Sequence, residues 1–265
     1  MKIAIIGCGN MGNAIVRGLI GGTVFKPSDI TAIDVRREPL DALKAFAPEV
    51  NTELRNYDIL PEVDIIILAV KPWMIKDTIW DIKFKLDYSR QILVSIAARV
   101  TLDEMNESLK KVSEPFELPA LFRVIPNTAI AVGESMSLIS SKNTSSEQQD
   151  LLVKIFNEMG KAVVVDESKL ASGSALTSCG IAHFFRHVRA AMQAGVEMGF
   201  YPKEAQDLIV HTMKGAAELL LQTGTNPEEE IDKVTTPGGI TIKGLNEMEA
   251  NGFSNAIIKG LKASK

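Results

Sequence analysis

The chain has 265 residues, of which 46% are hydrophobic and 23% charged, and its formal net charge is −4. These values are typical of a globular protein with one large or two modest domains, and they exclude a mainly disordered chain and a broad basic surface for nucleic acid. Cys8 and Cys179 belong to no CxxC pair or zinc cluster, and no window approaches the length of a membrane-spanning helix. The apolar run Ile3–Ile6 is too short for a signal peptide, so we expect a cytoplasmic protein with no membrane partner.

Short apolar runs alternate with helical stretches over the first part of the chain. We expect strands at 3–6, 30–33, 64–70, 92–96, 121–125, 135–139 and 162–165, and helices at 10–20, 39–46, 102–110 and 147–159. Strands that are apolar throughout and separated by helices are typical of a parallel sheet covered on both faces. The sequence therefore predicts an α/β domain with a doubly wound parallel sheet over residues 1–163.

The pattern changes after Asp166, beyond which the sequence gives no convincing strand. Residues 168–199 predict one long helix, or two helices broken near Gly180. A further helix begins at Tyr201-Pro202, where proline is favoured in the first turn, and Thr225–Pro227 begins the next. We predict an all-α domain over residues 164–265, and apolar residues on several of its helix faces suggest a dimer core.

A glycine-rich turn lies directly between the first strand and the first helix. Its G-x-G-x-x-G pattern allows a tight turn, close approach of the backbone to a pyrophosphate, and close packing of the helix on the strand. The helix N-terminus then offers free N–H groups to phosphate oxygens. The pattern predicts a Rossmann-like, dinucleotide-binding domain whose phosphate-binding residues are Gly7, Cys8, Gly9, Asn10, Met11 and Gly12.

The end of the second strand carries competing signals for the cofactor. An acidic residue at the position of Asp34 usually binds the adenosine ribose hydroxyls and favours NAD. Arg36 and Arg37 follow at once, and a guanidinium there favours the 2′-phosphate of NADP. The residues leave the choice between NAD and NADP open.

Several short motifs resemble the pyrroline-5-carboxylate reductase family, in the family's order and over nearly the whole chain. They are Ile6–Ile15, Ala69–Pro72, Ser95–Ala98, Arg123–Thr128 and Val234–Thr241. The resemblance implies NADPH in preference to NADH, a small imino-acid substrate, and a homodimer or a higher oligomer of dimers. It also implies that Asn56 contacts the adenosine portion of the cofactor.

Two of these motifs, Ala69–Pro72 and Ser95–Ala98, lie at the ends of expected strands. In open α/β folds, ligands bind at the edge of the sheet where such strands end. Small residues after the fourth expected strand allow a flat nicotinamide to approach the backbone. The candidate cofactor residues outside the glycine turn are Asp34, Arg36, Asn56, Ala69, Val70, Lys71, Pro72 and Ala97.

The loop Thr236–Thr241 is the candidate substrate site. Two glycines before a helix leave N–H groups free for a carboxylate, and threonine hydroxyls add donors and acceptors. The resemblance implies that this loop grips the substrate carboxylate and that Thr241 reaches the ring nitrogen. The candidate substrate-binding residues are Thr236, Gly238, Gly239 and Thr241, with Thr241 as the catalytic candidate.

The implied reaction is hydride transfer to C5 of a cyclic imine, 1-pyrroline-5-carboxylate, which yields L-proline. A protonated imine is already an electrophile, so a strong general acid is not required. No metal is expected, because His183 and His187 lack a carboxylate in an HExxH-like frame.

One stretch departs from the family pattern. The family usually has Gly-Ser-Gly-Pro-Ala-Tyr where this chain has Ser178–His183, and Arg189 stands at an otherwise acidic position. This leaves open a related imine reductase with another substrate and a paralogue that binds NAD(P) without turnover. A 2-hydroxyacid-type dehydrogenase would need a catalytic lysine early in the second domain, where nothing around Lys169 supports that role.

Overall fold

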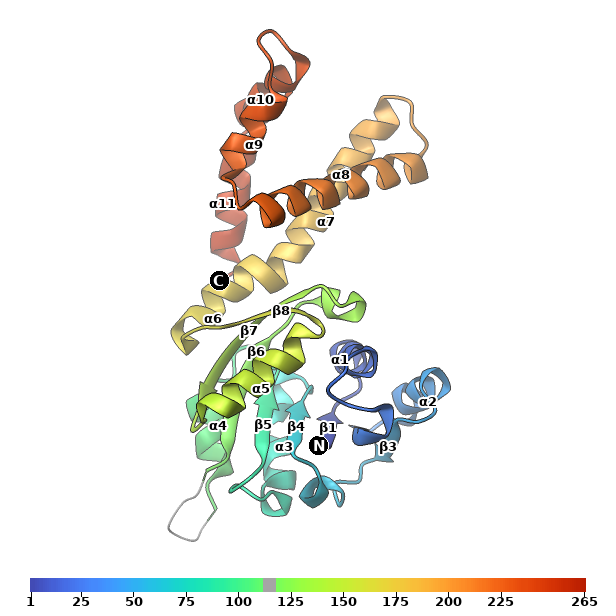
Figure 1. The fold of residues 1–265 in the computed structure, drawn as a ribbon, viewed down its shortest axis with the longest axis vertical. Coiled ribbons are helices and arrows are strands. Elements are labelled where there is room, and N and C mark those ends of the chain that lie inside the picture. Colours follow the sequence, from blue (N-terminus) through green and yellow to red (C-terminus); the bar gives the residue numbers. More distant parts are fainter. Residues whose placement is uncertain (112–117) are drawn as a thin grey trace. The chain divides into compact units, whose positions relative to one another are not determined.

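The computed structural model describes residues 1–111 and 118–265 (Figure 1). These residues divide into two compact units, Met1–Ser178 and Cys179–Lys265. The first unit contains a sheet covered by helices, and the second contains only helices. Among the described residues, no helix is both long enough and apolar enough to cross a bilayer. The expected domain boundary at 163/164 stays a prediction.

An eight-stranded sheet in the order β3-β2-β1-β4-β5-β6-β7-β8 forms the centre of the first unit. Strand order reverses between β1 and β4, which is the switch point of a doubly wound fold. The strands are β1 (Ile3–Ile6), β2 (Ile30–Asp34), β3 (Asn51–Leu54), β4 (Ile65–Leu68), β5 (Ile92–Ser95), β6 (Ala120–Ile125), β7 (Ser135–Lys142) and β8 (Gly160–Val164).

The sheet is not parallel throughout, which corrects the expectation from the sequence. β7 pairs antiparallel with β6, starting with Ile125 opposite Leu138, and β8 pairs parallel with β7. Only a short 3-10 turn, Thr128–Val132, separates β6 from β7. Without a crossover helix the chain returns beside the strand it has just left, and the pairing is antiparallel.

Helices cover both faces of the sheet. The helices of the first unit are α1 (Asn10–Gly21), α2 (Arg37–Phe46), α3 (Ile75–Ile82), α4 (Leu102–Leu109), α5 (Ser146–Asn157) and α6 (Glu167–Ser174). Short 3-10 helices lie at Pro27–Asp29, Leu60–Glu62, Pro72–Met74, Lys83–Lys85 and Thr128–Val132. The sequence analysis predicted neither β3, which is a polar edge strand, nor α3, in which Ile75, Ile79 and Ile82 are buried.

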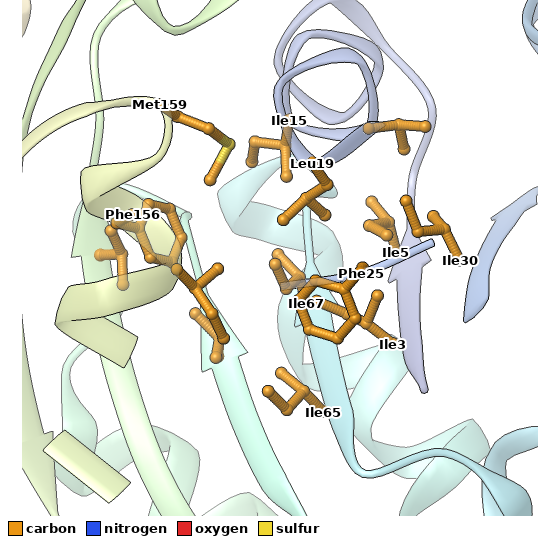
Figure 2. Close-up of a cluster of buried hydrophobic side chains, with 14 of the residues drawn as sticks. Ile3, Ile5, Ile15, Leu19, Phe25, Ile30, Ile65, Ile67, Phe156 and Met159 are labelled. Carbon is orange, nitrogen blue, oxygen red and sulfur yellow. The ribbon is translucent and has the colours of Figure 1, made fainter. Parts of the chain in front are cut away.

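Apolar side chains pack on each face of the sheet. Alternate strand residues such as Ile3 and Ile5 join α1 and α5 on one face, where Phe156 and Met159 complete the packing (Figure 2). On the other face, Ile66 and Leu68 pack with residues of α3 and α4. Because both faces are buried, the strands read as uninterrupted apolar runs in the sequence.

The helices of the second unit begin after a π turn at Ala175–Cys179. They are α7 (Gly180–Glu197), α8 (Pro202–Thr223), α9 (Pro227–Val234), α10 (Ile240–Ala250) and α11 (Phe253–Ala263). The sequence left open one long helix over residues 168–199 or two helices broken near Gly180. The structure has α6, the π turn and α7 in direct succession over residues 167–197. α7 and α8 approach closely where Gly195 faces the methyl group of Ala205. Many apolar side chains of this unit nevertheless stay exposed, including Phe184, Phe185, Leu221 and Ile240.

Candidate active site

The three glycines of the phosphate turn meet different surroundings. Gly7 has a φ of +102°, and an added Cβ would lie 2.7 Å from the Ala69 carbonyl oxygen. An added Cβ at Gly12 would collide with the Gly7 carbonyl oxygen. Gly9 has open space around the same position. Packing within the chain therefore explains Gly7 and Gly12, whereas Gly9 leaves room for a ligand.

The helix behind Gly9 begins without a side-chain cap. Gly9 is the N-cap residue of α1, and no side chain accepts a hydrogen bond from the first turn. The first turn carries no acidic residue either, so the positive end of the helix dipole faces the open space at Gly9. This arrangement can bind the oxygens of a pyrophosphate.

Asp34 is bound to the phosphate turn itself. Its carboxylate is 7% exposed, and Oδ2 accepts a hydrogen bond of 2.6 Å from the backbone N–H of Cys8. Oδ1 accepts a hydrogen bond of 2.9 Å from the backbone N–H of Arg36, whose Nε lies 3.5 Å from the same oxygen. The carboxylate therefore joins the end of β2 to the turn after β1.

Cys8 is a buried thiol rather than a nucleophile. Its side chain is 1% exposed, and Sγ lies 3.7 Å from the Ile33 carbonyl oxygen. Burial and, to a lesser degree, the negative charge of Asp34 together raise the pKa of the Cys8 thiol to about 12. Desolvation therefore outweighs any lowering of this pKa by the nearby N-terminus of α1.

The ends of β2 and β3 bring three arginines to one edge of the sheet. Arg36 and Arg37 follow β2 and are exposed. Arg55 follows β3, and its Nε donates to the Val35 carbonyl oxygen over 3.0 Å. The sequence prediction missed Arg55 because it missed β3, whose polar sequence gives no hydrophobic signal.

Asn56 lies in the same region and closes a turn. Its side-chain oxygen accepts from the backbone N–H of Asp58 over 3.0 Å, and its Nδ2 donates to Glu53 over 2.9 Å. These bonds orient the side chain, and a contact with adenosine stays a prediction.

The remaining cofactor candidates of the first unit lie at the carboxyl ends of β4 and β5. The Ala69 N–H donates to the Ile6 carbonyl and the Ile96 N–H to the Leu68 carbonyl, which aligns both segments with the phosphate turn. Lys71 is exposed and precedes the 3-10 turn that begins at Pro72. Ala97 is buried, and its backbone N–H donates a hydrogen bond of 3.2 Å to Ser95 Oγ. The structure therefore brings the candidates Gly7–Gly12, Ala69–Pro72 and Ala97 to one edge of the sheet.

The candidate substrate loop belongs to the second unit. Gly238 has a φ of +73°, and the Gly239 N–H donates to the Thr236 carbonyl over 2.9 Å. Gly239 is the N-cap residue of α10, again without a side-chain cap. Thr241 lies exposed in the first turn of this helix. Because the Gly239 N–H is already bonded, which corrects the expectation that both glycine N–H groups are free, the donors left at this helix N-terminus are the N–H groups of the first turn of α10 and the Thr241 hydroxyl.

The segment that differs from the family pattern begins at Ser178, which is hydrogen-bonded to the loop after β6. The Ser178 hydroxyl donates to the Pro126 carbonyl over 2.8 Å. Asn127 Nδ2 donates to the Thr177 carbonyl over 3.5 Å, so the Arg123–Thr128 motif supports the π turn. A serine at position 178 is therefore accommodated by a hydrogen bond that glycine could not make.

An ion pair that the sequence analysis did not predict links β6 to the start of α6. Arg123 Nη1 lies 2.6 Å from Glu167 Oε1, and the Leu102 N–H donates to the same oxygen over 2.7 Å. The pair joins β6, α4 and α6. Within the described ranges, no group of three or more His, Cys, Asp or Glu side chains is placed to hold a metal.

The doubly wound sheet, with a glycine turn at its carboxyl edge and a helical second unit, defines an NAD(P)-dependent oxidoreductase. Residues 2–99 match the family described as NADP oxidoreductase coenzyme F420-dependent, and residues 167–265 match the family described as pyrroline-5-carboxylate reductase dimerisation.

Relatives that align over nearly all of this chain narrow this class. The chain is 36% identical to pyrroline-5-carboxylate reductase of Methanosarcina acetivorans, covering 100% of this chain and 97% of that one. It is 37% identical to pyrroline-5-carboxylate reductase 1 of Dictyostelium discoideum over 99% of its length, and spans about half, 48%, of that protein. The crystal structure of Plasmodium falciparum pyrroline carboxylate reductase with NADP bound superposes with a TM-score of 0.87 at 24% identity, covering 100% of this chain and 95% of that one. The chain belongs to the pyrroline-5-carboxylate reductase family.

Proposed function

We propose that this protein reduces 1-pyrroline-5-carboxylate to L-proline with NADPH. The observation that carries the proposal is the phosphate turn, in which Gly9 alone is unexplained by packing and opens onto an uncapped helix N-terminus. The family relationship supplies the substrate. The relatives from Methanosarcina acetivorans and Dictyostelium discoideum are both named as pyrroline-5-carboxylate reductases.

The first unit holds the cofactor in this proposal. The backbone of Gly7–Gly12 binds the pyrophosphate, as the free N–H groups of α1 allow. Asp34 keeps the turn in shape, while Arg36 and Asn56 serve the adenosine end. The segments Ala69–Pro72 and Ala97 border the nicotinamide end. The reduced nicotinamide supplies a hydride, and these residues supply its orientation.

The second unit binds the substrate. The free N–H groups in the first turn of α10 hold the carboxylate, with Thr236, Gly238 and Gly239 shaping the loop. The hydroxyl of Thr241 holds the ring nitrogen by a hydrogen bond. The substrate reacts as the protonated imine: as the hydride forms a bond to C5, the electrons of the C=N bond move to nitrogen, which keeps its proton and becomes the neutral amine of proline. No residue of the loop has to titrate for this step.

The second unit also forms the dimer in this proposal. Its match to a dimerisation family and the exposed Phe184, Phe185, Leu221 and Ile240 are the supporting observations. Apolar side chains of this size are normally buried in a soluble oligomer. A cytoplasmic location stays a prediction.

One assay tests the reaction. Purified protein is mixed with pyrroline-5-carboxylate and either NADPH or NADH, and the absorbance of the reduced cofactor is followed while proline is quantified. We expect proline to form in proportion to the NADPH oxidised. Cofactor binding without oxidation would favour a paralogue that binds NAD(P) but does not catalyse. Oxidation only with other cyclic imines would indicate a related reductase.

A further inference from the structure

We propose that Arg55 selects NADPH over NADH by contacting the 2′-phosphate of the cofactor from the end of β3. The inference rests on the proposed function only in taking the carboxyl edge of β1 and β2 as the cofactor site. Arg55 lies outside both the glycine turn Gly7–Gly12 and the segment Asp34–Arg37 at the end of β2, so it is an additional residue for cofactor specificity.

The backbone fixes the position of Arg55. Leu54 pairs with Asp34 in the ladder between β2 and β3, and the Arg55 N–H donates to the Asp34 carbonyl over 3.0 Å. Arg55 therefore lies opposite Val35, one residue before Arg36. Its φ of +52° turns the chain at this point, a conformation that non-glycine residues rarely adopt.

The side chain is also held in place. Nε of Arg55 donates to the Val35 carbonyl over 3.0 Å, which uses one of the five donor N–H groups of the guanidinium. In the described part of the chain, no acidic side chain forms an ion pair with Arg55 or Arg37. The two terminal nitrogens of Arg55 are therefore left for an external anion.

Asp34 does not oppose a phosphate here. A carboxylate at this position usually binds the ribose hydroxyls and repels a 2′-phosphate. In this chain its two oxygens accept from the N–H groups of Cys8 and Arg36, and it is 7% exposed. Its charge is directed to the phosphate turn and to the Arg36 side chain 3.5 Å away.

The resulting edge carries Arg36 and Arg37 after β2 and Arg55 after β3, and the Asp34 carboxylate lies 3.5 Å from Arg36 Nε. A phosphate dianion accepts paired hydrogen bonds from a guanidinium, whereas a ribose hydroxyl gains much less from the same charge. Arg36 approaches from the end of β2 and Arg55 from the end of β3. The geometry therefore favours the cofactor that carries a 2′-phosphate.

The test compares two substitutions with a control. Arg55→Asn removes the guanidinium and keeps a residue that tolerates left-handed backbone, while Arg55→Lys keeps the charge. Lys161→Asn removes one positive charge from β8, at the opposite edge of the sheet. Dissociation constants for NADPH and NADH are measured by calorimetry without substrate.

We expect Arg55→Asn to weaken NADPH binding on the order of tenfold and to leave NADH binding within about twofold, as the loss of one charge-assisted contact predicts. Arg55→Lys should lose only part of the preference for NADPH over NADH, and Lys161→Asn should keep all of it. An equal loss for both cofactors, or no loss, would overturn the proposal. If Arg55→Asn does not fold, Arg55→Gly removes the same group and relaxes the backbone, with the same expectation.

The binding measurement also separates this proposal from the proposed reaction. Wild-type protein that prefers NADPH through Arg55 but produces no proline would contradict the reaction alone. Wild-type protein that produces proline while Arg55→Asn binds both cofactors normally would contradict the role of Arg55 alone.

Discussion

The backbone N–H of Cys8 donates to Asp34 Oδ2 over 2.6 Å and thereby joins the phosphate turn to the end of β2. Both groups are buried, so the hydrogen bond is shielded from water and an unpaired Cys8 N–H would be costly. In this protein the acidic residue at the end of β2 therefore stabilises the glycine turn after β1, which we propose as the pyrophosphate site.

Substitution of Asp34 should therefore affect both cofactors. We expect Asp34→Ala to lower the free energy of unfolding by about 1–3 kcal/mol, the cost of an unsatisfied buried N–H, and to weaken NADPH and NADH binding alike. Asp34→Asn keeps an acceptor oxygen and should lose less stability and less cofactor affinity than Asp34→Ala. Thermal unfolding and calorimetry measure the two effects. A loss restricted to NADH would mean that Asp34 serves the ribose instead.

Gly9 and Gly12 should respond differently to an added methyl group. Gly12→Ala places a Cβ against the Gly7 carbonyl and should cost about 3 kcal/mol of stability. Gly9 has an ordinary φ of −67° and open space, so Gly9→Ala should cost no more than about 1 kcal/mol. Because its methyl group occupies the pyrophosphate position, Gly9→Ala should still weaken cofactor binding at least about tenfold. Normal cofactor affinity in folded Gly9→Ala would contradict this use of the turn.

Thr241→Ala should slow turnover without weakening cofactor binding. Loss of a hydrogen bond to a charged nitrogen corresponds to a fall in kcat of about tenfold to a hundredfold. Thr212→Ala is the matched control, because that hydroxyl donates only to the Leu208 carbonyl of its own helix. Steady-state rates with the imine and calorimetry with NADPH check both parts. A cofactor-binding defect in Thr241→Ala would show that the two units have other roles.

The two cysteines should differ in their reaction with a thiol reagent such as a dinitrobenzoate disulfide. Cys179 is partly exposed, whereas burial raises the pKa of Cys8 to about 12. At pH 8 we expect one thiol to react in the native protein and two in urea, and Cys179→Ser should remove the fast reaction. A fast native reaction in Cys179→Ser would contradict the buried state of Cys8.

The same raised pKa predicts a loss of stability in alkali. The unfolded thiol ionises near its ordinary pKa of about 8.5, while the folded thiol stays protonated to a much higher pH. The contribution of Cys8 is therefore fully present below about pH 8.5 and is lost as the pH rises toward 12. Denaturant unfolding between pH 8 and 10 should show a smaller decline in Cys8→Ala than in wild-type protein.

The ion pair between Arg123 and Glu167 should matter more than an exposed pair. Glu167→Ala leaves the buried Arg123 guanidinium without its carboxylate and should lower the free energy of unfolding by about 3 kcal/mol. The Lys2–Glu62 pair is exposed on both sides, so Glu62→Ala should change it by no more than about 1 kcal/mol. Equal effects in denaturant unfolding would mean that the Arg123 charge is solvated in another way.

Much of the cofactor half could be predicted because its signals are local. The apolar runs of β1, β2, β4 and β5 and the spacing of Gly7–Gly12 each lie within a few residues. β3 was missed because an edge strand that reads Asn-Thr-Glu-Leu carries no apolar pattern. α3 was missed although Ile75, Ile79 and Ile82 stand at the spacing of one helix face. Arg55 was missed along with β3, because its place beside Val35 exists only through strand pairing.

The sequence by itself determined that a glycine turn joins the first strand to the first helix, because the positive φ of Gly7 and the close contacts at Gly7 and Gly12 require glycine. Only the tertiary structure decided that β7 runs against β6, that Asp34 is bound to Cys8, and that arginines from two strands meet at one edge. Each of these depends on which segments lie side by side, and hydrogen bonds between residues 13 or more positions apart leave no periodic trace in the chain.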